Sequence, residues 1–200
     1  MKKSIIFLTG LIMSVLITNC SAVIRDGRKL DGLRNSVLRL HILAESDSEY
    51  DQSLKLKVRD ALLESDIFES ADSLESAERI AREKLDEIVS LAESTLLENG
   101  CNLPVTAEIA DVEFDERVYG DITMPSGEYR ALRVKIGSAQ GKNWWCVMYP
   151  PLCIPAVCDV EEDKSAEEVF SESELDIMYH PKKYEVRFAI WDKIKELLDD

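Results

Sequence analysis

The sequence predicts an α+β fold: a single domain in which a mainly antiparallel sheet packs against two or three helices. Apolar residues recur at three- and four-residue steps over 73–98, which is typical of an amphipathic helix. The short polar connection at 137–143 predicts antiparallel pairing of the strands on either side of it. Alternation of apolar and polar residues, which is typical of strands, recurs in four segments: 36–44, 105–114, 128–136 and 144–149.

The first 22 residues have the layout of a secretory signal peptide. Lys2 and Lys3 precede an apolar run over 5–17, and small residues follow up to Ala22. That run is shorter than the about 20 residues that a bilayer span needs. An uncleaved N-terminal anchor is the alternative. Lipid modification of Cys20 is disfavoured because Asn19 precedes it. We expect residues 23–35 to form a polar linker.

The elements of the domain at 36–158 follow in order. A strand over 36–44 leads through a turn into a helix over 50–64, and the long helix over 73–98 stops at Asn99–Gly100. The remaining three strands complete the sheet. Beyond them, 159–200 is predicted to be an acidic crossing followed by a C-terminal amphipathic helix over 183–198.

The charge of the chain excludes several classes of partner. The formal net charge is −15, and removal of the first 22 residues takes away two lysines and no acidic residue, which gives −17. Phosphate backbones and anionic lipid headgroups repel such a protein, so nucleic acid and membrane surfaces are not expected partners. No D-x-D-x-D-G calcium loop is present in the sequence. We expect no cofactor, no metal and no small-molecule substrate.

The cysteine pattern leaves several arrangements open. Of the five cysteines, Cys20 falls in the export segment, and four remain: Cys101, Cys146, Cys153 and Cys158. An even number in an exported protein favours two disulfides, for which three connectivities exist. A disulfide between Cys146 and Cys153 is one candidate pairing. A zinc site is the other option, although the spacings differ from the C-x2-C knuckle.

Catalytic residue types are scarce. The two histidines are His41, which lies in the first strand as a structural histidine would, and His180, which lies in an acidic surface region. No G-x-S-x-G, H-E-x-x-H or P-loop motif occurs in the sequence. We therefore predict a protein that is not an enzyme. The alternative is a cysteine-dependent envelope hydrolase in which Cys153 and His41 pair as nucleophile and base.

Aromatic residues and prolines are concentrated over 141–153, which has the sequence G-K-N-W-W-C-V-M-Y-P-P-L-C. Aromatic side chains beside a rigid Pro-Pro step are typical of a binding surface. This hypothesis assigns partner contacts to Trp144, Trp145, Tyr149, Pro150 and Pro151. The structural interpretation is that Trp144 and Trp145 point to opposite faces of a strand, one into the core and one beneath the terminal helix. Both interpretations stay open.

Two long stretches carry a resemblance to a known family. The first contains R-L-H-I-L-A-E-S-D-S and D-Q-S-L-K-L-K-V-R-D, and the second contains P-S-G-E-Y-R-A-L-R-V-K-I-G and N-W-W-C-V-M-Y-P-P-L-C. Together they closely resemble stage II sporulation protein R of endospore-forming bacteria, over about residues 36–158. Glu45 departs from the asparagine that is common in the family. The family motif falls on Arg39, His41, Ser46, Asp47, Asp51, Gln52, Lys55, Arg59, Asp60, Asn143, Trp144, Trp145, Cys146, Pro150, Pro151 and Cys153.

The resemblance implies a signalling role in sporulation. Such proteins are made in the forespore and exported into the space between the forespore and mother-cell membranes. There they activate a membrane-embedded aspartic protease, which processes the pro-form of the mother-cell sigma factor, sigma-E. The resemblance carries over no catalytic residue. An exported scaffold or binding protein is a further alternative.

Overall fold

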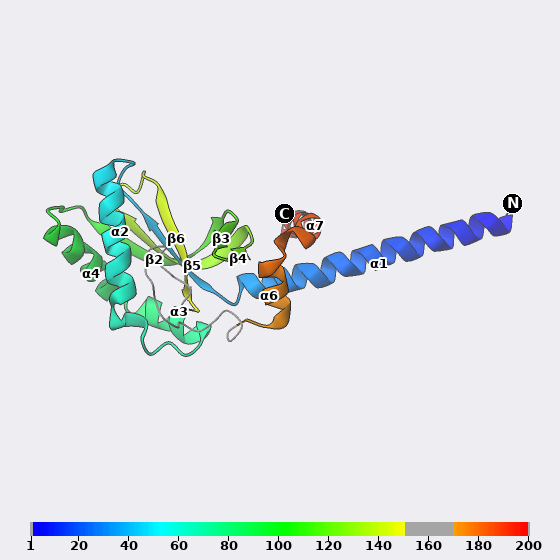
Figure 1. Cartoon of the computed structure of the whole chain (residues 1–200), viewed down its shortest axis with the longest axis horizontal. Helices are drawn as coiled ribbons and strands as arrows, with labels where there is room; N and C mark the ends of the chain where they lie inside the picture. The colour runs from blue at the N-terminus through cyan, green and yellow to red at the C-terminus, as the bar shows by residue number, and fades with distance from the viewer. Residues whose placement is uncertain (1, 151–169, 200) are drawn as a thin grey trace. The chain divides into compact units, whose positions relative to one another are not determined.

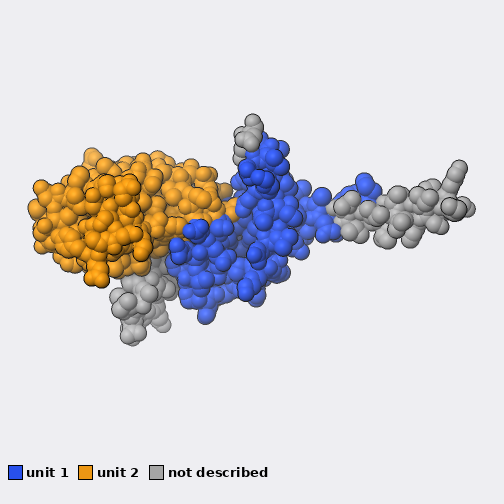
Figure 2. All heavy atoms as spheres, turned by 90° about the horizontal axis from the view of Figure 1, so that it is seen from above, with its two compact units in different colours: residues 1–33, 115–126, 170–200 blue, residues 34–114, 127–169 orange. Residues whose placement is uncertain are grey.

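The computed structural model describes residues 2–150 and 170–199. The chain divides into two compact units, shown in different colours in Figure 2. The sheet unit comprises Arg34–Phe114 and Gly127–Val169, and the helical unit comprises Met1–Leu33, Asp115–Ser126 and Phe170–Asp200. Each unit is described separately below.

The sheet unit contains a four-stranded sheet in the order β2-β5-β1-β6 (Figure 1). Its strands are β1 (Leu38–Leu43), β2 (Val105–Phe114), β5 (Gly127–Ile136) and β6 (Asn143–Tyr149). β2 pairs antiparallel with β5, and β6 pairs antiparallel with β1, whereas β1 and β5 are parallel. The predicted α+β class with a mainly antiparallel sheet is confirmed.

The predicted hairpin between the last two strands is wrong, because β1 lies between β5 and β6. Neighbouring strands in a sheet are about 4.8 Å apart, so the connection must span only about 10 Å to pass over β1. Six or seven residues span this distance easily. β1 is the natural central strand, since Leu38, Leu40 and Ile42 are fully buried on one face and Arg39 on the other.

Helices cover one face of this sheet. They are α2 (Glu49–Glu64), the short 3-10 helix η1 (Asp66–Phe68), α3 (Leu74–Glu83) and α4 (Leu85–Glu98). α2, α3 and α4 all lie on the same side of the strands in Figure 1. The core between the layers is apolar and includes Leu40, Ile42, Leu54, Val58, Ile88, Ala92, Leu96, Leu132 and Val134. Each large side chain buried there contributes roughly 1.5–3 kcal/mol.

The single helix predicted over 73–98 is two helices that meet at Lys84. The backbone of Lys84 has φ −105° and ψ 19°, which ends α3 and begins α4. A straight helix of this length would extend about 39 Å. The two shorter helices pack separately, α3 against β1 and β2 and α4 against α2 and β2. Tertiary packing therefore breaks a segment whose local periodicity is continuous.

The helical unit is built around the first and last helices of the chain. Its elements are α1 (Lys2–Arg34), β3 (Arg117–Tyr119), β4 (Ile122–Met124), α6 (Glu172–Tyr179), the 3-10 helix η2 (Pro181–Lys183) and α7 (Glu185–Asp199). The predicted C-terminal helix is present as α7. α6 and the β3–β4 hairpin were not predicted from the sequence. Among the helices of the described residues, none is long and apolar enough to cross a membrane.

The segment predicted to be a linker at 23–35 is helical up to Arg34. Two glycines and many polar residues weigh against a helix there when the sequence is read locally. Tertiary contacts with α7 supply the missing stabilisation: Arg187 forms an ion pair with Asp26 at 2.5 Å, and the Trp191 indole N–H donates to Asp31 at 3.0 Å. Gly27 is required by this packing, because a Cβ atom would lie 2.2 Å from the Trp191 ring.

Candidate functional site

The sheet of the sheet unit has a second face, opposite α2, α3 and α4, and this face carries most of the chemistry. Side chains alternate along each strand, so Arg39, His41 and Leu43 of β1 lie on the second face while Leu40 and Ile42 face the helices. The register places further residues on the second face: Thr106, Glu108, Ala110, Val112 and Phe114 of β2; Tyr129, Ala131, Arg133 and Lys135 of β5; and Asn143, Trp145 and Val147 of β6.

A cluster of aromatic rings encloses two of the family-motif residues on this face. The Arg39 guanidinium, fully buried, lies 4.0 Å from the ring centroid of Phe114 and 4.8 Å from that of Tyr129. His41 meets Phe114 edge-on at 5.6 Å and Trp145 at 5.7 Å between ring centroids. Cation–π and edge-to-face contacts of this kind stabilise the buried cationic side chain.

His41 is 4% exposed, and neither of its ring nitrogens has a hydrogen-bond partner among the described residues. Burial and, to a smaller extent, the positive charges of Arg133, Arg39 and Lys135 together lower the pKa of His41 to about 4. The imidazole is therefore neutral at neutral pH. The position agrees with a structural histidine, but the missing hydrogen bonds are unusual for a buried polar group.

The described residues do not bring a thiol to His41. Cys146 is in register with Leu40, and both Cys146 and Cys101 belong to the core on the helix-covered face. Cys101 is a free thiol. Cys153 lies outside the described residues, so its pairing with His41 and its disulfide with Cys146 both stay predictions. No group of three metal-ligating side chains occurs within the described part of the chain.

A second set of family-motif residues forms a hydrogen-bonded network that joins the turn after β1 to the loop between β5 and β6. The Lys142 N–H donates to the Asp47 carboxylate at 2.6 Å, and the Gly141 N–H donates to the Ala44 carbonyl at 2.9 Å. The Gln52 amide donates to the Ser46 carbonyl at 2.9 Å. Ser46 donates to Asp51, and the Asp51 N–H donates to the Ser48 hydroxyl that caps α2. The two halves of the family motif thus meet here.

Lys55 is at the centre of this network and is only 5% exposed. Its ammonium donates to the Gln52 side-chain oxygen at 2.5 Å and to the carbonyls of Lys142 at 3.1 Å and Asn143 at 3.3 Å. Burial lowers the pKa of Lys55, and the nearby Asp47 carboxylate opposes this shift. Because Lys55 donates to two successive carbonyls, it fixes the loop that leads into β6.

Replacement of Lys55 by methionine should lower the free energy of unfolding by about 2 kcal/mol. Methionine keeps most of the buried stem but leaves three acceptors without a donor, and relief of the buried charge offsets only part of that loss. Lys57→Met is the matched control, because Lys57 is exposed on the same helix, and it should change the free energy by less than about 0.5 kcal/mol. Urea unfolding of the two variants provides the comparison, and equal effects would contradict a structural role for Lys55.

The aromatic residues predicted as one binding patch do not share a surface. Trp144 packs against the helix-covered core, with the Arg59 guanidinium 4.2 Å from its ring centroid, whereas Trp145 lies on the second face. Arg59 also pairs with Asp60 at 2.6 Å. Tyr149 packs against Leu38 and α3 on the helix-covered side. Pro150 is buried, and Pro151 lies outside the described residues. Among the described members of the predicted patch, Trp145 is the one shown to share the second face with the charged residues.

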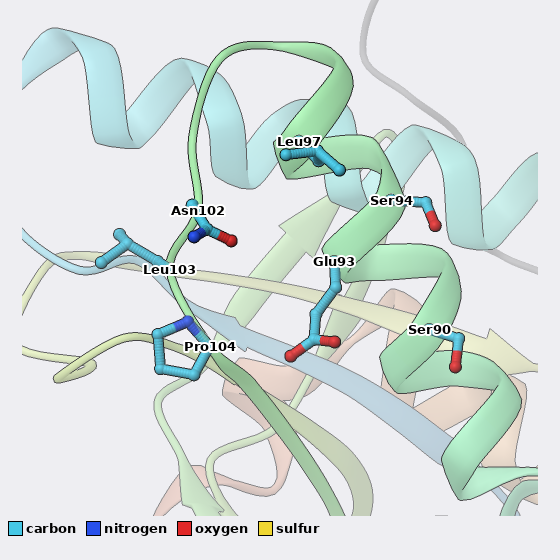
Figure 3. Close-up of a pocket in the computed structure, with 7 residues that line it drawn as sticks. All are labelled: Ser90, Glu93, Ser94, Leu97, Asn102, Leu103 and Pro104. Atoms are coloured by element: carbon cyan, nitrogen blue, oxygen red, sulfur yellow. The ribbon is translucent and has the colours of Figure 1, made fainter.

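A cavity of about 520 Å³ lies between α4 and the chain leading into β2 (Figure 3). It is lined by Ser90, Glu93, Ser94, Leu97, Asn102, Leu103 and Pro104. The carboxylate of Glu93 in this lining accepts a hydrogen bond from the Val105 N–H at 3.1 Å. Ser90 donates to the Asp86 carbonyl of its own helix at 2.8 Å. The carboxylate and Ser90 are thus both engaged in contacts that hold α4 and the chain leading into β2.

Comparisons with known proteins agree with the family resemblance. A family model described as stage II sporulation protein R matches residues 34–159. The chain is 36% identical over 149 residues to stage II sporulation protein R of Bacillus subtilis (strain 168), which covers 71% of this chain and 66% of that relative. The match therefore spans just under two thirds of the length of the relative. No solved structure matches the chain. The matched range includes both the network and the second face.

Proposed function

Because the chain belongs to the stage II sporulation protein R family, we propose that it is a secreted signal that activates a membrane-embedded aspartic protease during sporulation. That protease would in turn process the pro-form of sigma-E. Family membership carries the proposal and supports a role in sporulation. The signal-peptide layout of residues 1–22 supports the exported location, in the space between the forespore and mother-cell membranes.

The protein acts in this proposal by binding and not by catalysis. Two features favour binding: His41 is enclosed by aromatic rings, and Cys101 and Cys146 belong to the core on the opposite face of the sheet from it. Binding activates the protease only if the signal has a higher affinity for the active arrangement than for the idle one. A shift from 1:99 to 99:1 requires a preference of about 10⁴-fold. An extended, specific contact surface is therefore needed.

Co-expression in a non-sporulating host tests this function. The full chain should produce removal of the pro-sequence when it is expressed with the membrane protease and the sigma-factor precursor, and a chain lacking residues 1–22 should not. Both chains must be shown to accumulate in folded form. Absence of processing with the full, exported chain would overturn the proposal. Cys153→Ser should retain activity, and retention would exclude the cysteine-dependent hydrolase.

A further inference from the structure

Charge is distributed unevenly between the two sides of the sheet unit. The helices α2, α3 and α4 carry eleven acidic and five basic residues, a net charge of −6. The second face differs. Where β1, β5 and β2 pair, it carries three basic residues, Arg39, Arg133 and Lys135, and one acidic residue, Glu108. In a chain with a net charge of −15, this face is locally positive. Such a local field attracts an acidic group and orients its approach.

The exposed cations of this face are incompletely neutralised. Lys135 lies 2.7 Å from one Glu108 oxygen, and the same oxygen lies 3.7 Å from Arg133. One carboxylate is thus shared between two cations, each with a side chain that is 32% exposed. The Nε–H of Arg133 is buried and has no acceptor within the described part of the chain. Arg133 retains capacity for a second carboxylate.

His41 adds an independent observation at the same place. It is paired in register with Arg133 on the adjacent strand, is only 4% exposed, and has both ring nitrogens without partners in the described residues. A neutral imidazole offers one donor and one acceptor. The unsatisfied polar atoms of two neighbouring strands therefore converge on one part of the second face, next to the aromatic ring of Trp145.

We propose that Arg133 and Lys135 form a receptor for a carboxylate-bearing segment of a partner protein, with Trp145 as the adjoining apolar contact and the buried His41 as the neighbour that positions Arg133 from the adjacent strand. This inference rests on the proposed function, in which the partner is the extracytoplasmic part of the protease. An arginine fork binds a carboxylate through two parallel hydrogen bonds, which gives geometric specificity as well as affinity. An aromatic ring beside a charged contact is the usual composition of a strong protein-binding site.

A protein carboxylate is favoured over the other anions. Nucleic acids and anionic membranes present many charges over an extended surface, and the acidic helical layer repels them. A receptor built from two adjacent cations on one strand matches a single acidic side chain. The partner segment is therefore a peptide with one or a few aspartate or glutamate residues next to apolar ones.

Titration with a model peptide tests the receptor directly. The probe is a blocked peptide of alternating glutamate and leucine, added to the full chain while backbone amide signals are followed by NMR. We expect shifts concentrated on β1, β5 and β6, and none with the matching lysine–leucine peptide. The double variant Arg133→Gln/Lys135→Gln should weaken binding at least 10-fold. Arg79→Gln/Arg82→Gln is the matched control on exposed positions of α3, with the same change in net charge and no expected effect.

Several outcomes would overturn the inference. Equal binding of the acidic and basic peptides, no binding of the acidic peptide, or an unchanged affinity in the β5 double variant would each do so. Response to anionic lipid vesicles without response to the peptide would assign the face to a membrane. Binding that appears only after the acidic residues of 159–168 are replaced by glutamine and asparagine would show that the chain itself occupies the receptor.

The same variants separate this inference from the proposed function. In the co-expression assay, the β5 double variant should lose processing and the α3 double variant should retain it. Failure of the unmodified chain to activate processing overturns the proposed function, while the peptide titration still decides the receptor. Full processing by a β5 double variant that no longer binds the peptide would show that the receptor does not contact the protease.

Discussion

Substitution of Gly141 by alanine should lower the free energy of unfolding of the sheet unit by roughly 3 kcal/mol. A Cβ atom at this position would lie 2.2 Å from the Ser46 carbonyl oxygen and 2.5 Å from its carbonyl carbon. Because both atoms belong to the backbone, no side-chain rotation relieves the overlap. The loop must move away, and the bonds from Gly141 to Ala44 and from Lys142 to Asp47 are strained or lost with it.

Gly100→Ala is the control for this experiment. Gly100 has φ +76°, so alanine there carries a backbone cost of about 1 kcal/mol, but no atom lies within 4 Å of the added Cβ. Gly141 does not have a positive φ, so any loss in the Gly141 variant beyond that of the Gly100 variant comes from steric contact with Ser46. Urea unfolding followed by tryptophan fluorescence gives both free energies. Hydrogen exchange at the amides of Gly141 and Lys142 should accelerate in the Gly141 variant alone. A loss no larger than that of Gly100→Ala would show that the turn and loop are not rigidly joined.

Acid should destabilise the protein through His41. The folded-state pKa of His41 is about 4, below the value of 6.5 for an unperturbed histidine. Protonation therefore favours the unfolded chain: the contribution to stability is complete above pH 6.5 and is lost as the pH falls toward 4. A shift of this size corresponds to about 3 kcal/mol. The charged groups that act on His41 are Arg39 of β1 and Arg133 and Lys135 of β5, and Glu108 of β2 pairs with the latter two.

His41→Leu separates this effect from other titrations. Leucine has a similar volume and suits the apolar rings of Phe114 and Trp145, so we expect stability at pH 7 within about 1 kcal/mol of the unsubstituted protein. Between pH 6.5 and 4, the free energy of unfolding of the variant should fall by about 3 kcal/mol less than that of the unsubstituted protein. Glu108 titrates near the same site, but hydrogen bonding to Lys135 lowers its pKa below the ordinary value of 4.5, so its titration lies at the acid end of this window or below it. Parallel curves of unfolding free energy against pH would contradict the assignment.

The family motif divides into two sets of residues with different physical roles. Ser46, Asp47, Gln52 and Lys55 hold one turn to one loop through hydrogen bonds, so their spacing reflects the geometry of the fold. Substitutions there act on stability. Arg39 and His41 lie instead on the second face. There, the two ring nitrogens of His41 are buried and have no hydrogen-bond partner among the described residues. Substitutions on the second face are the better means of testing partner binding.

The sequence by itself determined the local elements. Alternation placed the strand at Val105–Phe114 with its observed bounds, and the Asn99–Gly100 stop ended α4, because strand alternation and glycine's access to positive φ are properties of a few adjacent residues. The fold class followed from the same local signals. The opposite orientation of Trp144 and Trp145, weighed from alternation alone, agrees with the structure.

Only the tertiary structure decided how these elements are arranged. The insertion of β1 between β5 and β6, the break at Lys84 and the helical conformation before Arg34 depend on contacts between residues far apart in the sequence. So does the convergence of His41, Arg133 and Lys135, which comes from parallel pairing of strands about ninety residues apart. Local periodicity sets which side chains share a face of one strand. The neighbours of that strand are chosen by burial of the whole core, which no local pattern encodes.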